Sequence, residues 1–398
     1  MKINTHHTVA AALLALGLAA APAYAAPEVK TKGGFEIKDG DFSFKLGGRI
    51  MLDFVEPGVD VTAMGQNLFF RRARLELSGK VSKEWAYSAE FDFAENAVVA
   101  KDLFVTYSGF ENQEVLIGQF KAPWSLEELS SSKQLAFLER SLMNSAWSTA
   151  HRTGLGWRHY GESHSLTVAA YGKEAGVANS ANQDEPLNFG ARFVWAPMRS
   201  AEGLLHIGIA LAEEEIEGGG VQLRARPEAR PSNGNVRLVD TSNIADATGL
   251  SKTGLEVAWM SGGLSVQGEY QIVSVDSVAE GDPEFSGYYL EARWFPAGEV
   301  RPYKMSTAAF SGISPLNIEG AWEYRIRLSS VDLEDGLVSA ASGNAQAGTE
   351  DNISVGVTYY PNANVRWMFE YIQADVSSAN PAEDESPSFF QGRFQLSW

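Results

Sequence analysis

Residues 389–398 read Phe-Phe-Gln-Gly-Arg-Phe-Gln-Leu-Ser-Trp and alternate apolar with polar side chains up to the last position. A β-strand turns successive side chains to opposite faces. One face therefore carries Phe390, Gly392, Phe394, Leu396 and Trp398, and the other carries Gln391, Arg393, Gln395 and Ser397. An apolar outer face with a polar inner face is what a membrane-spanning β-barrel strand needs. A soluble sheet with one wet face shows the same alternation, so this stretch alone leaves both folds open.

The other end of the chain indicates export. Lys2 precedes an apolar run over residues 9–21, and Ala23-Tyr24-Ala25 provides small residues for cleavage. This pattern is typical of a secretory signal peptide, here residues 1–25, and the run is too short to span a bilayer. Polar residues interrupt every later hydrophobic segment, so residues 26–398 are expected to enter a membrane as strands in one domain.

Composition excludes several classes of function. The chain has 32 Lys and Arg residues against 50 Asp and Glu residues, a formal net charge of -18, which argues against nucleic acid as a partner. It has no Cys, which excludes disulfides and cysteine metal sites. The few histidines have no metal-site spacing, and Ser163-His164-Ser165 in a predicted turn lacks catalytic partners. We therefore expect no enzyme activity, no catalytic residue, no metal and no cofactor.

Segments of alternating polarity, bounded by turn residues, recur along the chain. We predict strands near residues 43–55, 67–81, 85–94, 101–109, 114–121, 152–158, 164–173, 187–197, 203–214, 252–261, 264–275, 285–295, 319–332, 351–360, 365–376 and 388–398. The predicted fold is all-β, a transmembrane antiparallel β-barrel of about sixteen strands, and bacterial single-chain barrels have an even strand number.

The predicted connections alternate between long and short. Residues 82–84, 159–163, 262–263 and 361–364 are short, whereas 122–150, 174–186, 215–251, 333–350 and 377–387 are long. Long extracellular loops and short periplasmic turns are the expected form of an outer-membrane barrel. Residues 296–318 break the rule, and an extra hairpin there would raise the strand number to eighteen.

Charged residues within these strands must face the lumen, because a charge at the bilayer midplane costs a few kcal/mol. Alternation turns a set of arginines inward, which are Arg49, Arg72, Arg74, Arg152, Arg158, Arg192, Arg325, Arg327 and Arg393. Inward carboxylates such as Glu76, Glu90 and Glu323 offset them in part, which leaves a mixed lumen with a modest basic lean. Arg71 is out of register and would face lipid unless a β-bulge turns it inward.

The third long connection, residues 121–150, is too apolar for a fully solvated loop. Leu126, Leu135 and Phe137 need a surface to pack on. Folding into the barrel would satisfy them and would place Lys121, Lys133 and Arg140 at a constriction, in reach of ions. The alternative is a loop that packs over the rim or against a neighbouring subunit.

Several motifs resemble the phosphate-selective porin O and P family. They are Phe70-Arg71-Arg72-Ala73-Arg74-Leu75, Gly118-Gln119-Phe120-Lys121-Ala122-Pro123, Ser131-Ser132-Lys133, Phe137-Leu138-Glu139-Arg140-Ser141 and Gly320-Ala321-Trp322-Glu323-Tyr324. The resemblance implies a usually trimeric sixteen-stranded porin of the Gram-negative outer membrane, whose third loop enters the pore. It further implies that arginines and lysines bind phosphate or polyphosphate, at positions that match Lys121, Lys133, Arg140, Arg72 and Arg74.

The last residues also resemble the C-terminal signal by which outer-membrane proteins are recognised for barrel insertion. Phe394, Leu396 and Trp398 would form this assembly signal, although the signal ends more often in Phe. The partners expected from these patterns are small anions such as phosphate, outer-membrane lipids, lipopolysaccharide, the barrel assembly machinery and, as a homotrimer, two further copies of the chain.

Three functions remain open from the sequence. The first is a water-filled channel for passive diffusion of small anions. The second is a general or weakly cation-selective porin without a phosphate site, in which the inward carboxylates dominate. The third is a structural or adhesive barrel with a plugged lumen.

Overall fold

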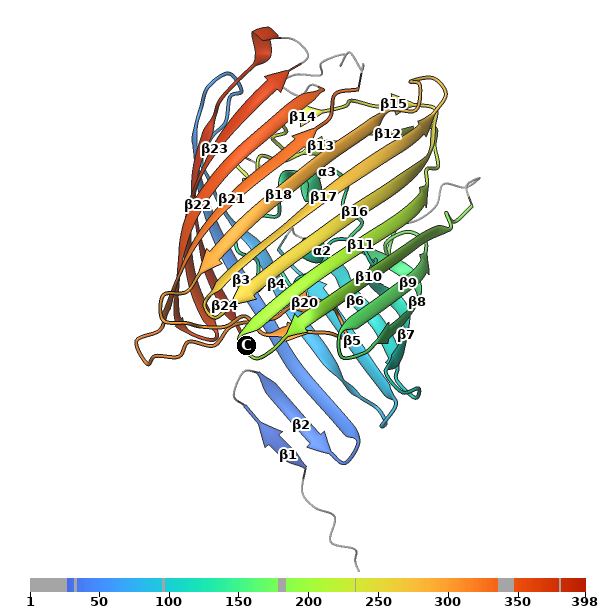
Figure 1. Ribbon diagram of the computed structural model, residues 1–398, viewed down its shortest axis with the longest axis vertical. Helices are drawn as coiled ribbons and strands as arrows, with labels where there is room; N and C mark the ends of the chain where they lie inside the picture. The colour runs from blue at the N-terminus through green and yellow to red at the C-terminus, as the bar shows by residue number, and fades with distance from the viewer. Residues whose placement is uncertain are drawn as a thin grey trace, which may run out of the picture.

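The computed structural model describes residues 27–31, 34–94, 97–177, 184–232, 234–335, 347–378 and 381–398. The predicted signal peptide, residues 1–25, lies outside these ranges. Sixteen antiparallel strands form a closed barrel (Figure 1), namely β3 (Phe42–Gly58), β4 (Asn67–Lys80), β5 (Trp85–Asp92), β6 (Val99–Tyr107), β7 (Gln113–Lys121), β8 (His151–Tyr160), β9 (His164–Tyr171), β10 (Asn188–Arg199), β11 (Gly203–Glu215), β16 (Ala247–Ser261), β17 (Leu264–Ser277), β18 (Glu284–Trp294), β21 (Ala321–Asp332), β22 (Gly348–Asn362), β23 (Val365–Ser378) and β24 (Ser388–Ser397). Each predicted strand corresponds to one of these, which confirms the predicted fold.

The barrel closes where β24 pairs with β3. The pairing runs from Ser388 opposite Gly58 to Ser397 opposite Arg49. Trp398 extends the seam, because its backbone N–H donates to the Gly48 carbonyl at 3.1 Å and its carbonyl accepts from the Gly48 N–H at 3.1 Å. On the lumen side, both oxygens of Asp53 accept from Arg393 at 2.6 Å. Backbone pairing and a buried ion pair therefore hold the two ends of the barrel together.

Replacement of Gly48 by Val is expected to weaken this seam. A Cβ atom there would lie 2.5 Å from the Arg74 carbonyl oxygen and 2.6 Å from the Trp398 ring, so one of them must shift. Overpacking of this kind costs about 1–3 kcal/mol. We expect the folded band to convert to the unfolded band at a lower temperature in electrophoresis. Ile50→Val on the same strand is the control, and equal conversion temperatures for the two variants would contradict the expectation.

A short hairpin precedes the barrel and was absent from the sequence prediction. β1 (Glu28–Lys30) pairs with β2 (Phe35–Asp39), and β2 pairs with the first residues of β3. Figure 1 shows this blue hairpin beyond the end of the barrel at which the chain terminates. It is too short and too polar to give a clear alternating pattern.

Side chains alternate across the wall as predicted. On β21, Trp322 is 51% exposed on the outer face whereas Arg327 is 1% exposed inside. Aromatic pairs such as Trp322 with Tyr359 and Trp294 with Tyr324 lie near strand ends on the outer face. Such aromatic girdles mark the membrane interfaces. Within the described ranges, no helix is long and apolar enough to cross a membrane.

Two extracellular loops fold into the barrel. Loop L3, residues 122–150, carries the short helices α2 (Leu126–Leu129) and α3 (Leu142–Trp147), and Leu126, Leu138 and Leu142 are buried completely. Loop L5, residues 216–246, carries β12 (Gly220–Val221), β13 (Arg224–Ala225), β14 (Val239–Asp240) and β15 (Ile244–Ala245). Both loops pack against lumen-facing residues of the wall in one apolar cluster. The prediction that the third loop enters the lumen is confirmed.

The long connection between β18 and β21 enters the barrel from the periplasmic end. This segment T6, residues 295–320, contains a small hairpin of β19 (Tyr303–Lys304) and β20 (Ala309–Phe310), which pairs with no barrel strand. The barrel therefore has sixteen strands and not eighteen. Met305 and Phe310 pack against inward residues Val194 and Met260 and against Leu126 of L3. T6 and L3 thus meet inside the lumen.

Candidate functional site

Three linked cavities lie between L3 and the wall formed by β3 to β9. The outer cavity has a volume of about 250 Å³, the middle cavity about 170 Å³ and the inner cavity about 140 Å³. The outer and middle cavities share Arg72, Arg74 and Arg140, and the middle and inner cavities share Lys121 and Asp102. The inner cavity also reaches Thr307 of T6, which comes from the periplasmic side. The three cavities therefore adjoin one another past L3, and together they are called the conduit.

Cationic side chains predominate along this conduit. Nine described lining residues are cationic, namely Arg49, Arg71, Arg72, Arg74, Lys101, Lys121, Arg140, Arg158 and Arg230. Four are carboxylates, namely Glu90, Asp92, Asp102 and Glu128. The whole chain carries a formal net charge of -18. The conduit therefore has the opposite sign of charge to the protein around it.

A β-bulge in β4 concentrates arginines at the conduit. The β3–β4 register shifts because Met51 pairs with Arg72 and the next residue, Leu52, pairs with Phe70. Arg71 is the extra residue, and its guanidinium donates inward to both Glu139 oxygens of L3, at 2.5 and 2.9 Å. A bulge re-aims a side chain in this way. Three arginines, at positions 71, 72 and 74, therefore enter the lumen where strict alternation would allow two.

These arginines differ in how far they are neutralised. Arg74 donates to Asp92 at 2.7 Å and also to Glu90, and Arg49 pairs with Glu76 and Glu90. Arg72 is 3% exposed, and its Nη1 donates to the Met51 sulfur at 3.6 Å. Among the described residues, Arg72 forms no ion pair and its Nε has no hydrogen-bond partner. Its charge acts on the conduit without a paired carboxylate.

The cations at and next to L3, which are Lys121 at the end of β7 and Lys133 and Arg140 in the loop, have different surroundings. Lys121 and Arg140 line the middle cavity, and each lies within 3.3 Å of a Glu128 carboxylate oxygen. Arg140 also donates to the Ser130 carbonyl at 3.1 Å. Lys133 instead donates to both oxygens of Glu76, at 3.0 and 2.7 Å, and lines none of the three cavities. The structure thus brings Lys121, Arg140, Arg72 and Arg74 together and leaves Lys133 to one side.

This difference predicts unequal effects for two lysine variants. Lys121→Gln removes a charge from the conduit, and we expect the zero-current potential in a salt gradient to shift toward cations. Both lysines have a carboxylate partner, but Lys133→Gln removes a charge that lines none of the three cavities, so we expect a shift of less than about half as much. Comparable shifts for the two variants would contradict the cavity assignment.

The remaining inward arginines have mostly structural partners. Arg158 lines the inner cavity and donates to Glu114 at 2.8 Å, and Arg152 donates to the His151 carbonyl at 2.9 Å. Arg192 binds Glu256 through two hydrogen bonds and the Ala308 carbonyl of T6 at 3.0 Å. Arg325 lies 3.4 Å from Glu370, and Arg393 binds Asp53. All face inward as predicted, but L3, L5 and T6 cover several of them.

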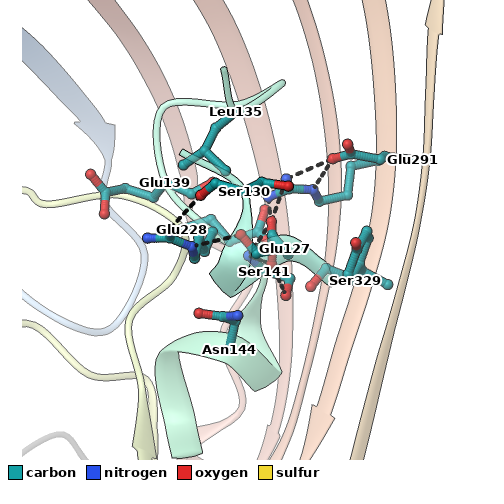
Figure 2. Close-up of polar contacts among 12 residues, drawn as sticks. Glu127, Ser130, Leu135, Glu139, Ser141, Asn144, Glu228, Glu291 and Ser329 are labelled. Carbon is teal, nitrogen blue, oxygen red and sulfur yellow. Dashed lines mark hydrogen bonds and ion pairs between the residues drawn. The ribbon is translucent and has the colours of Figure 1, made fainter. Parts of the chain in front are cut away.

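A buried ionic network anchors L3 to the wall. Arg327 of β21 lies 2.9 Å from Glu127 of α2 and 2.7 Å from Glu291 of β18, and it donates to the Glu139 carbonyl at 3.1 Å. Glu127 also accepts from the Ser141 backbone N–H and hydroxyl. Figure 2 shows Glu127 and Ser141 side by side, with Glu291 approaching from the wall. This network sets the position of the cations that L3 carries.

The carboxyl groups of L3 respond to their neighbours in opposite ways. Burial raises the pKa of Glu127 to about 7, although Arg327 opposes the rise. Burial would also raise the pKa of Glu139, but the Arg71 and Arg230 guanidiniums hold it well below its usual range. Glu139 therefore remains a charged partner that ties L3 to the β4 bulge and to L5.

L5 adds further arginines above the conduit. Burial lowers the pKa of Arg226 to about 9, and repulsion from Arg230 and Arg237 adds to the decrease. Arg230 lines the outer cavity and lies 3.5 Å from Glu139. The cluster of arginines at 224, 226 and 230 was a signal that the sequence prediction did not use.

Comparison with known proteins gives the architecture a family. The sequence model of the family described as phosphate-selective porin O and P matches residues 44–398. The chain belongs to this family. It is 30% identical to Porin O of Pseudomonas aeruginosa over 395 residues, which cover 91% of this chain and 90% of that protein.

Solved porin structures share the fold. An anion-selective porin from Comamonas acidovorans matches with a TM-score of 0.60 at 12% identity, covering 90% of this chain and 100% of that one. The outer-membrane protein OmpT of Vibrio cholerae, in a trimer form, matches with a TM-score of 0.54 at 10% identity. The match covers 90% of this chain and 99% of that one. This member of the porin O and P family is therefore an outer-membrane porin.

Proposed function

We propose that this porin O and P family member is a passive channel for small anions and that it binds oxyanions such as phosphate along the conduit. One observation carries the proposal: nine cationic lining residues against four carboxylates in an otherwise acidic protein. A cationic lining raises the local anion concentration and lowers the barrier for anion entry. The family description, and Porin O as a relative, support phosphate as the physiological anion.

The proposed binding residues are Arg72, Arg74, Arg140 and Lys121. All four line the middle cavity, from β4, from L3 and from the end of β7. Guanidinium groups bind phosphate through paired N–H donors, and an ammonium adds a point charge. No chemical step is needed for passage, so we propose no catalytic function and no cofactor. Within the described residues, no group of three or more His, Asp or Glu side chains is placed to hold a metal.

A homotrimer is part of the proposal and is supported by the trimer form of the Vibrio cholerae protein of similar fold. Contacts with lipopolysaccharide remain a prediction. Recognition of Phe394, Leu396 and Trp398 by the assembly machinery also remains a prediction. Phe394 packs against Trp367 on the outer face, with ring centroids 4.7 Å apart.

The decisive experiment is the zero-current potential of the purified protein in a planar bilayer under a potassium chloride gradient, repeated with added phosphate. We expect the anion-selective sign and a chloride current that phosphate reduces. A cation-selective potential would favour the second function, in which the carboxylates dominate. Absence of conductance would favour a plugged structural barrel.

A further inference from the structure

The inner cavity differs in chemistry from the rest of the conduit. One side is apolar and is formed by Phe104 of β6, Leu116 and Phe120 of β7, and Pro123 and Leu129 of L3. The rest of the lining is polar and consists of Lys121, Arg158, Asp102 of β6, Thr167 of β9 and Thr307 of T6. Cations therefore outnumber carboxylates there, two to one. The interior of a water-filled porin is polar, so an apolar patch beside these charges is unexpected for a path that serves hydrated inorganic ions alone.

Phe104 is the accessible part of this apolar patch. Leu116 and Phe120 are each 4% exposed, whereas Phe104 is partly exposed and meets Phe120 edge to face, with ring centroids 6.3 Å apart. A hydrated phosphate gains nothing from such a surface. An anion with an apolar body gains free energy by removing that body from water.

The guanidinium of Arg158 on the cationic side is only partly paired. Nη1 of Arg158 donates to Glu114 at 2.8 Å, but its buried Nε has no hydrogen-bond partner among the described residues. Lys121 lines the same cavity and continues into the middle cavity. An anionic head group can therefore be held at the cations while its apolar body contacts Phe104.

We propose that the inner cavity is a binding site for organic anions with one ring or a short alkyl body, such as aryl phosphates and aryl carboxylates. The cavity volume of about 140 Å³ is close to that of an engineered apolar cavity of about 150 Å³ that binds benzene. This inference rests on the proposed anion conduction and narrows its substrate class. The site would retain such anions at the last step before the periplasm.

The first test uses the unmodified protein and two matched pairs of anions. Chloride current is titrated with phosphate and with phenyl phosphate, and separately with acetate and with benzoate. We expect half-block by phenyl phosphate at a concentration about tenfold below that for phosphate, and a similar ratio for benzoate against acetate. Equal blocking within both pairs overturns the inference while the anion selectivity stands. A cation-selective pore would instead remove the proposed function on which the inference rests.

The second test locates the site. Phe104→Asn is expected to reduce the tenfold ratio of half-blocking concentrations within each anion pair to less than about twofold. Phe104→Leu keeps an apolar surface, so this variant should retain most of the ratio. Arg158→Gln is expected to weaken block by all four anions to a similar degree, because it removes charge and not apolar area. Folding of each variant is checked by electrophoretic mobility before and after heating. A full ratio in a folded Phe104→Asn variant would show that the inner cavity is not the site.

Discussion

Arg327→Met is expected to release L3 from the wall, with a large loss of stability and a wider, noisier pore. Arg327 is 1% exposed and compensates Glu127 and Glu291, with Glu228 of L5 a further 3.6 Å contact. Removal of one partner from a buried ion pair costs about 3–5 kcal/mol, because the remaining charges are left uncompensated. Single-channel conductance and thermal unfolding measure the two effects.

Two further variants make this expectation specific. Arg199→Met removes an exposed arginine at the end of β10 and should change neither the single-channel conductance nor the thermal stability. Adding Glu127→Gln and Glu291→Gln to Arg327→Met removes the uncompensated carboxylates, so stability should recover in part while the conductance stays high. Unchanged conductance in a folded Arg327→Met variant would show that the apolar contacts of Leu126 and Leu142 suffice to hold L3.

Arg72→Glu is expected to produce the largest shift in ion selectivity. Arg72 lines both the outer and the middle cavity and has no ion pair among the described residues, so no contacting carboxylate offsets its charge. The substitution changes the lining from nine cations and four carboxylates to eight and five. The new carboxylate would lie close to Arg71 and Arg74, which favours folding.

The measurement is the zero-current potential at low and at high salt. We expect a clear shift toward cations at low salt and a smaller one at high salt, because mobile ions screen the lining. Arg199→Glu makes the same change of charge outside the conduit and serves as the control. If Arg199→Glu shifted the potential as far as Arg72→Glu did, overall charge and not the conduit would set selectivity.

The strands were predictable because a membrane barrel imposes one simple period. Each residue faces either lipid or lumen, so polarity alternates along β21 from Trp322 to Ser329 just as the sequence indicated. The inward direction of Arg327 and Arg393 follows from the same constraint. The period alone could not give the direction of Arg71, because a β-bulge is a local exception to the period. The bulge is seen in the pairing register of β3 and β4.

The contents of the lumen were less predictable. The apolar residues of L3 signalled an inward fold, but nothing in the spacing of Lys121 and Lys133 showed that Glu76 would pair with one of them. L5 and T6 have no periodic pattern, and their inward course depends on contacts with residues far along the chain, such as Met305 with Met260. Loop positions of this kind depend on tertiary packing, which a local pattern does not encode.

The seam between β24 and β3 affects how such a channel can assemble without leakage through an incomplete barrel. Arg393 and Asp53 are 340 positions apart, so the contact that completes the wall joins the two extremes of the domain. Bringing such distant segments together is slow and comes late in folding. Until then β3 and β24 are open edges, which hydrocarbon does not tolerate. A barrel with an open seam is therefore not a stable pore in the membrane. The permeability of the outer membrane then increases in steps, one complete barrel at a time.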